Sequence, residues 1–329
     1  MKDVILLNST ATYNHMGCYL TMAGLKRFLS SVGGNVRYEL PVNRPFPAGL
    51  KDFIDKNKDV YIVINGEGTL HDDQEYAKYL INSCSPFSDR VVLLNAQYRN
   101  MSENFNSLVS EFPIVQVRTK FDLGYAQDKG INALYCPDML FFSGVSSLNQ
   151  KSHNKIVITD SHSEQSSADL TGFFCRKEYF SKWVDFHYRV GSASKYEPYM
   201  QALLNVAVAF NFYSQTSFLN KKNKHYFDEL LSLISGAKCL VTGRYHAACM
   251  AILFNVPLVY HYSNTSKIKD LCNDWEYGVP YDKSVDSNAM LNMAISDSNS
   301  WSLGVGERVN RKMKVQYDNL KSTVNEIFK

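Results

Sequence analysis

The stretch VTGRYHAACMAILFNVPLVYHY, residues 241–262, contains one complete unit of an α/β fold. An apolar run ends at Gly243, an apolar helical pattern covers 246–255, and a second apolar run follows Pro257. Two strands joined through a helix are expected to pair in parallel, with the turn at the carboxyl end of the first strand. Arg244 and His246 flank a single position in that turn, so a tight turn would point both side chains at the same space.

The residue types in this turn favour an anion. Arginine is a permanent cation with forked donors, and histidine exchanges a proton near neutral pH. The helix start adds free N–H groups and a partial positive charge. Together these groups suit a phosphate that is held and then released with a proton. The alternative is a buried His246 bonded to a backbone carbonyl, with Arg244 bridging two parts of the fold.

Composition narrows the class of protein. The chain has 329 residues, which is enough for two domains of roughly 150 residues. A net charge of +3 argues against a dedicated nucleic-acid binder. The seven cysteines lie far apart without a CxxC pair, a usage typical of a reducing compartment. Because no apolar run is long enough for a signal peptide or a membrane span, we expect a cytoplasmic protein. Peripheral membrane contact is left open.

Strand and helix patterns alternate along the chain. The expected strands cover 3–8, 36–42, 59–66, 90–98, 113–119, 133–140, 155–160, 239–243 and 257–262. The expected helices cover 20–34, 50–58, 75–84, 105–112, 121–130, 199–213, 225–237, 246–255 and 307–329. The strands are continuous apolar runs, which is typical of parallel sheets covered by helices on both faces.

This layout predicts an α/β protein with two Rossmann-like parallel-sheet domains and an interdomain cleft. The polar, Ser-rich segment 141–154 is the expected linker. It separates an acceptor-side domain, 1–145, from a donor-side domain, 155–329. The last helix, 307–329, would close the second domain or cross back onto the first. The arrangement resembles the glycosyltransferase-B architecture, in which ligands gather at the carboxyl ends of strands.

Two candidate turns follow expected strands of the first domain. In TYNHMGCYLT, residues 12–21, Asn14 and Gly17 would let a ligand approach the next helix; an ordinary capped turn is the alternative. In INGEGTLHDD, residues 64–73, Glu67 stands between Gly66 and Gly68, where it could take a proton from a sugar hydroxyl. His71 is expected in the first turn of the next helix. The alternative is a Gly-rich turn with a capping glutamate, and the spacing matches no standard metal site.

Two further strand ends carry charged residues. Arg118 follows the strand in VRTKFD, residues 117–122, and could hold a carboxylate or phosphate, with Asp138 as its partner. Asp160 follows the strand in ITDSHSEQSS, residues 158–167. A surface ion pair and a polar turn, respectively, are the alternatives.

These blocks, in order, resemble the polysaccharide pyruvyl transferases. The matching positions are Asn14 to Gly17, Gly66-Glu67-Gly68, Val117-Arg118-Thr119, Pro137-Asp138, and Thr242-Gly243-Arg244-Tyr245-His246-Ala247 followed by Pro257 and Lys267. The resemblance implies transfer of the enolpyruvyl unit of phosphoenolpyruvate onto two sugar hydroxyls, with release of phosphate. It also implies that Arg244 and His246 hold the donor and that His246 acts as the acid. The sequence departs from the family pattern at Cys18, where Asp is usual, and at Glu67, where Gly is usual.

Three functions are consistent with these residues. The first is a pyruvyl transferase of surface polysaccharide biosynthesis that uses a glycan or lipid-linked sugar as acceptor. In it His246 is the acid, Glu67 or Asp160 the base, and the donor-binding residues are Arg118, Gly243, Arg244 and Lys267. The second is a glycosyltransferase that uses a nucleotide-activated acidic sugar such as CMP-Kdo. The third is a non-catalytic sugar-binding protein. No cofactor, metal or nucleic acid is expected for any of them.

Overall fold

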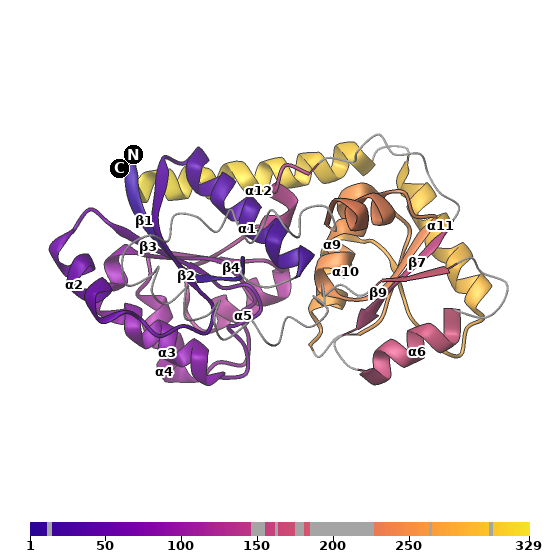
Figure 1. Ribbon diagram of the computed structural model, residues 1–329, viewed down its shortest axis with the longest axis horizontal. Helices are drawn as coiled ribbons and strands as arrows, with labels where there is room; N and C mark the ends of the chain where they lie inside the picture. Colours follow the sequence, from indigo (N-terminus) through magenta and orange to yellow (C-terminus); the bar gives the residue numbers. More distant parts are fainter. Residues whose placement is uncertain are drawn as a thin grey trace, which may run out of the picture.

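The structure, a computed structural model, describes residues 1–11, 15–145, 155–161, 164–174, 181–184, 227–262, 265–302 and 305–329. Within these ranges the chain forms two parallel sheets, one from each half, with helices packed on them (Figure 1). The predicted α/β class with parallel sheets is therefore confirmed. The expected helix 199–213 and the predicted site residue Asn14 lie outside the described residues.

The first sheet has the order β2-β1-β3-β4-β5-β6, and every pair is parallel. Its elements are β1 (Lys2–Ser9), α1 (Met16–Ser31), β2 (Gly34–Pro41), α2 (Ala48–Lys56), β3 (Tyr61–Asn65), α3 (Glu75–Cys84), η1 (Ser85–Arg90), β4 (Val91–Ala96), α4 (Glu103–Ser110), β5 (Ile114–Val117), α5 (Lys120–Asp128), β6 (Ala133–Tyr135) and η2 (Met139–Phe142). Successive residues of a strand face opposite sides. Ile5 and Leu7 accordingly join one apolar core, and Val4 and Leu6 join the other. Burial on both faces explains why these strands are apolar without alternation.

The second sheet has the order β11-β10-β9-β7-β8, again all parallel. Its elements are β7 (Ile156–Ser161), α6 (Glu164–Phe174), β8 (Ser181–Val184), β9 (Cys239–Gly243), α9 (Tyr245–Phe254), β10 (Leu258–Tyr260), α10 (Lys267–Trp275), β11 (Val279–Pro280) and α11 (Ser287–Ser302). The stretch 241–262 contains the end of β9, the helix α9 and the strand β10, as predicted. Residues 227–235 form a further helix.

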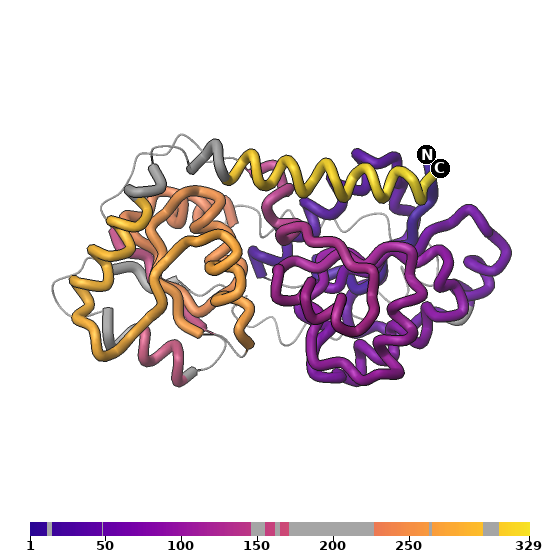
Figure 2. The backbone as a smooth tube through the Cα atoms, turned by 180° about the vertical axis from the view of Figure 1, so that it is seen from behind, coloured from indigo at the N-terminus to yellow at the C-terminus, as the bar shows by residue number. Residues whose placement is uncertain are grey.

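The last helix, α12 (Val305–Ile327), runs along both halves of the molecule (Figures 1 and 2). Val309 and Met313 pack in the core around α9, whereas Leu320 and Val324 pack with β1 and α1 of the first half. The helix therefore crosses back onto the first sheet, and the two chain termini lie close together (Figure 1).

Three local predictions were wrong. The first helix was expected from residue 20, but α1 begins at Met16 because His15 caps it and accepts the Cys18 N–H. The strand expected over 133–140 ends at Tyr135, because Asp138 caps the 3-10 turn η2 through Leu140 N. His71 lies in a loop four residues before α3 rather than in its first turn. Asp72 and Asp73 have left-handed backbone conformations, which prevent α3 from extending back to His71.

The two halves meet where α1 and η2 contact α9. Met16, Leu20, Leu140 and Phe141 join the apolar core around α9. Polar contacts continue the junction on α10: Arg99 donates to Asp270 at 3.0 Å, and the Lys120 N–H donates to Asp274 at 2.8 Å. These contacts bring the strand ends of the first sheet next to the first turns of α9 and α10.

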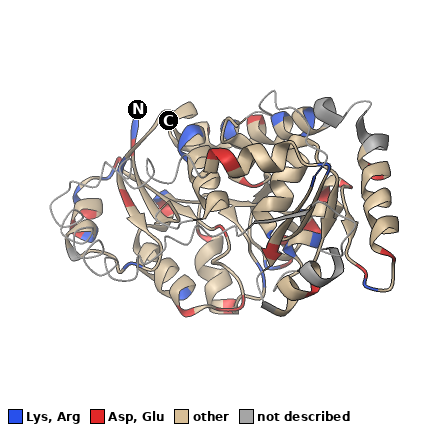
Figure 3. Ribbon diagram, turned by 45° about the vertical axis from the view of Figure 1, so that its right-hand side comes forward, with Lys and Arg blue, Asp and Glu red and all other residues tan. Residues whose placement is uncertain are grey.

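Charged residues are spread over both halves of the described chain. Basic and acidic residues are interspersed along the described ribbon of both halves (Figure 3). Among the helices of the described residues, none is both long and apolar enough to cross a membrane.

Candidate functional site

His246 stands where the halves meet, in the first turn of α9, and its residue is only 8% exposed. Gly17 of α1 lies directly against it: a Cβ on Gly17 would come within 2.3 Å of the His246 Cβ. Real Cβ atoms do not approach so closely, so residue 17 must lack a side chain for α1 and α9 to meet in this way. Gly17 thus sets the approach of the two helices.

Glu67 faces His246 from the first sheet. It occupies the turn after β3 with a left-handed φ of 26°, and its carboxylate is buried. Thr10 Oγ1 donates to Oε2 at 2.6 Å and Asn65 Nδ2 donates to the same oxygen at 3.1 Å. Cys18 Sγ donates to Oε1 at 3.1 Å, and Oε1 lies 3.6 Å from His246 Nε2. One carboxylate oxygen is thus held by two strong donors, and the other is directed at the imidazole.

Arg118 and Asp138 form the buried floor beside His246. Arg118 Nη1 donates to Asp138 Oδ2 at 3.0 Å, as the sequence suggested, and Nη2 donates to Gln97. Asp138 Oδ2 also lies 3.8 Å from His246 Nε2. The guanidinium stacks over the Tyr245 ring at 4.2 Å, and its buried Nε has no hydrogen-bond partner among the residues that the structure describes. A ligand oxygen that accepts a hydrogen bond from such a buried donor would contribute strongly to binding, because it would remove the cost of leaving the donor unsatisfied.

Arg244 is occupied by a carboxylate of its own half. Its Nε donates to Asp160 Oδ2 at 2.9 Å, and its Nη2 contacts the same oxygen. Both side chains are mostly buried. The two predicted site residues therefore form an ion pair, with the Arg244 fork already engaged.

Lys267 lies in the first turn of α10 and is partly buried. Burial and, next, the positive charge of Arg118 lower the pKa of Lys267 to about 8, although the negative charge of Glu67 opposes the shift. Smaller contributions from Arg99 and Arg244 show that these cations surround one region. A cluster of this kind is built to receive negative charge.

The imidazole of His246 responds to the same surroundings. Burial is the main cause that lowers the pKa of His246 well below its usual value, followed by the charges of Arg118, Lys267 and Arg244. Glu67 and Asp138 are near enough to stabilise a protonated ring, but burial and three cations outweigh them. The ring is therefore neutral at pH 7 in the absence of a ligand.

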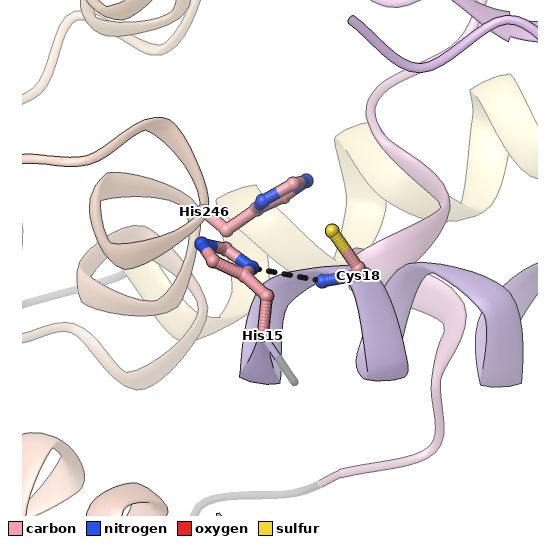
Figure 4. Close-up of side chains that lie close together, drawn as sticks. All are labelled: His15, Cys18 and His246. Carbon is pink, nitrogen blue, oxygen red and sulfur yellow. Dashed lines mark hydrogen bonds between the residues drawn. The ribbon is translucent and has the colours of Figure 1, made fainter. Parts of the chain in front are cut away.

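His15, which the sequence did not single out, and Cys18, which it noted as a departure from the family pattern, lie beside His246 (Figure 4). His15 and His246 lie edge to face with ring centroids 5.5 Å apart, and Cys18 lies beside them. His15, Cys18 and His246 each offer one ligand atom within 4.8 Å of the others, so within the described part of the chain this group could hold a soft metal ion. The surrounding cations disfavour a metal there, and the expectation of none stays a prediction. His15 and Thr21, which contacts His246 Nε2 at 3.4 Å, were missed because a helix start gives no hint of its partner.

The remaining predicted residues have different surroundings. Gly66 and Gly243 permit close packing, since a Cβ would lie 2.6 Å from Ala96 and 2.1 Å from Ser161 Oγ, respectively. Gly68 leaves space, since a Cβ placed on it would lie 4.0 Å from both Arg118 Nη2 and Gln97 Oε1. His71 hydrogen-bonds within its own loop, to Asp72 and Gln74. Roles for these residues in binding stay predictions.

The family comparison bears directly on this site. The family model described as polysaccharide pyruvyl transferase matches residues 15–265, well over half of the chain. The chain belongs to the polysaccharide pyruvyl transferase family. It is accordingly a transferase of polysaccharide biosynthesis, and the family match includes Glu67, Arg118, Asp160, Arg244 and His246. Lys267 lies just beyond the matched residues.

Solved structures show the fold of this family member. An uncharacterised protein from Klebsiella pneumoniae has a TM-score of 0.53 and 12% identity, over 83% of this chain and 87% of that one. UGT89C1 from Arabidopsis thaliana, complexed with UDP, has a TM-score of 0.54 and 8% identity, over 100% of both chains. The likeness to such proteins identifies a glycosyltransferase-B type of fold. A search of curated proteins found no match.

Proposed function

We propose that the protein transfers the enolpyruvyl group of phosphoenolpyruvate to two hydroxyls of a sugar, as a ketal, in the synthesis of a surface polysaccharide. One observation carries this proposal: His246 Nε2 lies 3.6 Å from the Glu67 carboxylate, in a site where the charges of Arg118, Lys267 and Arg244 also act on its ring. A trianionic donor needs cations, the attacking hydroxyl needs a base, and the donor carbon needs a proton. The acceptor would be a glycan or a lipid-linked sugar.

The donor would lie among the cations. The Nε of Arg118, which has no partner within the described part of the chain, suits a carboxylate or phosphate oxygen, and Lys267 adds a charge that is present below a pH of about 8. Arg244 would share its fork between Asp160 and the phosphate. The donor also brings negative charge next to His246, which raises the pKa of the ring above its value in the free protein. Donor binding and protonation of His246 are therefore coupled.

The proton balance of the proposed reaction suggests a role for each of the two facing side chains, Glu67 and His246. The C2 atom of the donor forms two bonds to acceptor oxygens and loses its bond to the phosphate oxygen, while its CH₂ carbon gains a proton and becomes CH₃. Of the two hydroxyl protons released, one matches the proton gained by carbon and the other leaves with phosphate. Glu67 would take the proton of the attacking hydroxyl, and His246, 3.6 Å away, would deliver one to the CH₂ carbon. Asp160 is the weaker candidate for the base because Arg244 already engages it.

The donor can be tested without knowing the acceptor. A ligand that binds only the folded state raises stability by about 2.7 kcal/mol at a hundred times its Kd, which is visible as a rise in Tm. Phosphoenolpyruvate should raise the Tm of the wild-type protein, and UDP and CMP should not. Arg244→Lys should reduce this rise, because lysine lacks the forked geometry. Arg37→Lys is the matched control, since Arg37 also pairs with a carboxylate through Nε but lies far from the site on β2.

The alternative donor would give the opposite pattern. A rise in Tm with CMP or UDP, and none with phosphoenolpyruvate, would favour a glycosyltransferase that uses a nucleotide-activated acidic sugar. The observation that favours this alternative is the buried Glu67 carboxylate 3.6 Å from His246, because it would repel a trianionic donor.

A further inference from the structure

We propose that Cys18 is a positioning residue for Glu67: its neutral thiol donates a weak hydrogen bond that directs Oε1 at His246. The thiol reaches the carboxylate from a different element, since Cys18 belongs to the first turn of α1 and Glu67 to the turn after β3. Sγ and Oε1 lie 3.1 Å apart, and Cys18 is only 6% exposed. Its catalytic consequence rests on the proposed function, but the hydrogen bond itself does not.

The surroundings of Cys18 determine its chemical state. A helix N-terminus by itself lowers the pKa of a cysteine and favours the thiolate. Here burial is the main cause that raises the pKa of Cys18 well above its usual value, and the negative charge of Glu67 raises it further. Cys18 therefore keeps its proton and acts as a donor, not as a nucleophile.

The hydrogen bond from Cys18 is needed because the other donors to Glu67 hold only one of its two carboxylate oxygens. Thr10 and Asn65 both bond to Oε2, so rotation of the carboxylate is opposed at one oxygen. Among the residues that the structure describes, Cys18 is the neighbour that donates to Oε1. Because S–H is a weak donor, it orients Oε1 while leaving that oxygen available to accept the proton of a hydroxyl. An O–H or N–H donor at the same place would compete more strongly for the same lone pairs.

A direct test is the S–H stretching band in infrared spectra. The Cys18 band is obtained by subtracting the spectrum of Cys18→Ser from that of the wild-type protein. Cys84 is the matched reference thiol: it is fully buried in the core of α3, and burial alone raises its pKa. We expect the Cys18 band at a lower frequency than the Cys84 band obtained from Cys84→Ala, and we expect Glu67→Gln to shift it. A Cys18 band that coincides with the Cys84 band and is unmoved by Glu67→Gln overturns the proposal.

Measurements of kcat distinguish a positioning role of Cys18 from a purely structural one. Cys18→Ala should lower kcat at unchanged affinity for phosphoenolpyruvate, measured by titration, and Cys18→Ser should restore part of the loss because it supplies a donor. Equal kcat in Cys18→Ala and in the wild type would show that the bond does not position Glu67. The infrared result is independent of activity, so absence of phosphoenolpyruvate turnover in the wild-type protein would contradict the proposed function while leaving the hydrogen bond testable.

Discussion

His246 Nε2 and Glu67 Oε1 lie 3.6 Å apart, although one belongs to α9 of the second half and the other to the turn after β3 of the first. Neither half contains both groups, so the pair exists only when the two halves are packed together. The buried contacts of α1 and η2 with α9 fix this packing. A base and an acid joined across two halves in this way can pass a proton only in the assembled fold.

Glu67→Gln should keep donor affinity and lose turnover. Glutamine preserves the size of the side chain but cannot accept a proton, so kcat should fall on the order of 10²–10⁴-fold, the usual contribution of a positioned base. Steady-state kinetics with a donor titration in parallel separates the two quantities. An equal loss of affinity and rate would indicate that Glu67 only shapes the turn.

Asp160→Asn should have a much smaller effect on turnover. Asparagine can still accept a hydrogen bond from Arg244, and its lost charge makes the site more positive, which favours an anionic donor. We expect kcat to fall by less than roughly 10²-fold, the lower limit for loss of a base. If Asp160→Asn is as slow as Glu67→Gln, the base has been assigned to the wrong carboxylate.

Gly17→Ala should disturb the site through His246. The added Cβ would lie 2.3 Å from the His246 Cβ, so α1 or α9 must shift, at a cost of about 1–3 kcal/mol in unfolding free energy. Turnover should fall as well, because the shift moves His246 relative to Glu67. Gly124→Ala is the matched control: it also replaces a helical glycine, in α5, but no atom lies within 4 Å of the added Cβ. Chemical denaturation and kinetics of both variants provide the comparison.

Lys267 should set an alkaline limit on donor binding. Its pKa of about 8 means that its charge is lost as the pH rises through this value, so donor affinity should fall above pH 8. Lys267→Arg keeps the charge and should remove this fall. Lys269→Arg, on the exposed side of α10, should leave it unchanged. The lowered pKa also has a stability consequence: the contribution of Lys267 is full above the unfolded value of 10.5 and is lost as the pH falls through about 8.

The sequence was sufficient to predict most of the strands and helices and the turn that carries Arg244 and His246. Strands buried on both faces leave continuous apolar runs, and a glycine between a strand and a helix marks a strand end. The contacts between distant elements could not be read in this way. Cys18 is 49 positions from Glu67, and Arg244 is 84 from Asp160, so only the folded chain reveals that they are partners.

The last helix illustrates the same limit. Its amphipathic pattern predicts a helix but does not say which core each part covers. In the structure, Val309 and Met313 pack in the core around α9 of the second half. Leu320 and Val324 pack in the core of the first half. Local periodicity reports that a face is apolar, whereas the identity of its partner depends on the tertiary arrangement.

The most direct measurement of the central claim is calorimetric titration of the protein with phosphoenolpyruvate in two buffers of different ionisation enthalpy. Near pH 6.5, about the ordinary pKa of histidine, the free His246 ring is neutral, and a bound trianion should cause it to take up a proton. The apparent binding enthalpy should then differ between the buffers by an amount that corresponds to proton uptake, and this difference should disappear in His246→Asn while binding persists. Binding without proton uptake in the wild-type protein, or the same uptake in His246→Asn, would contradict the account.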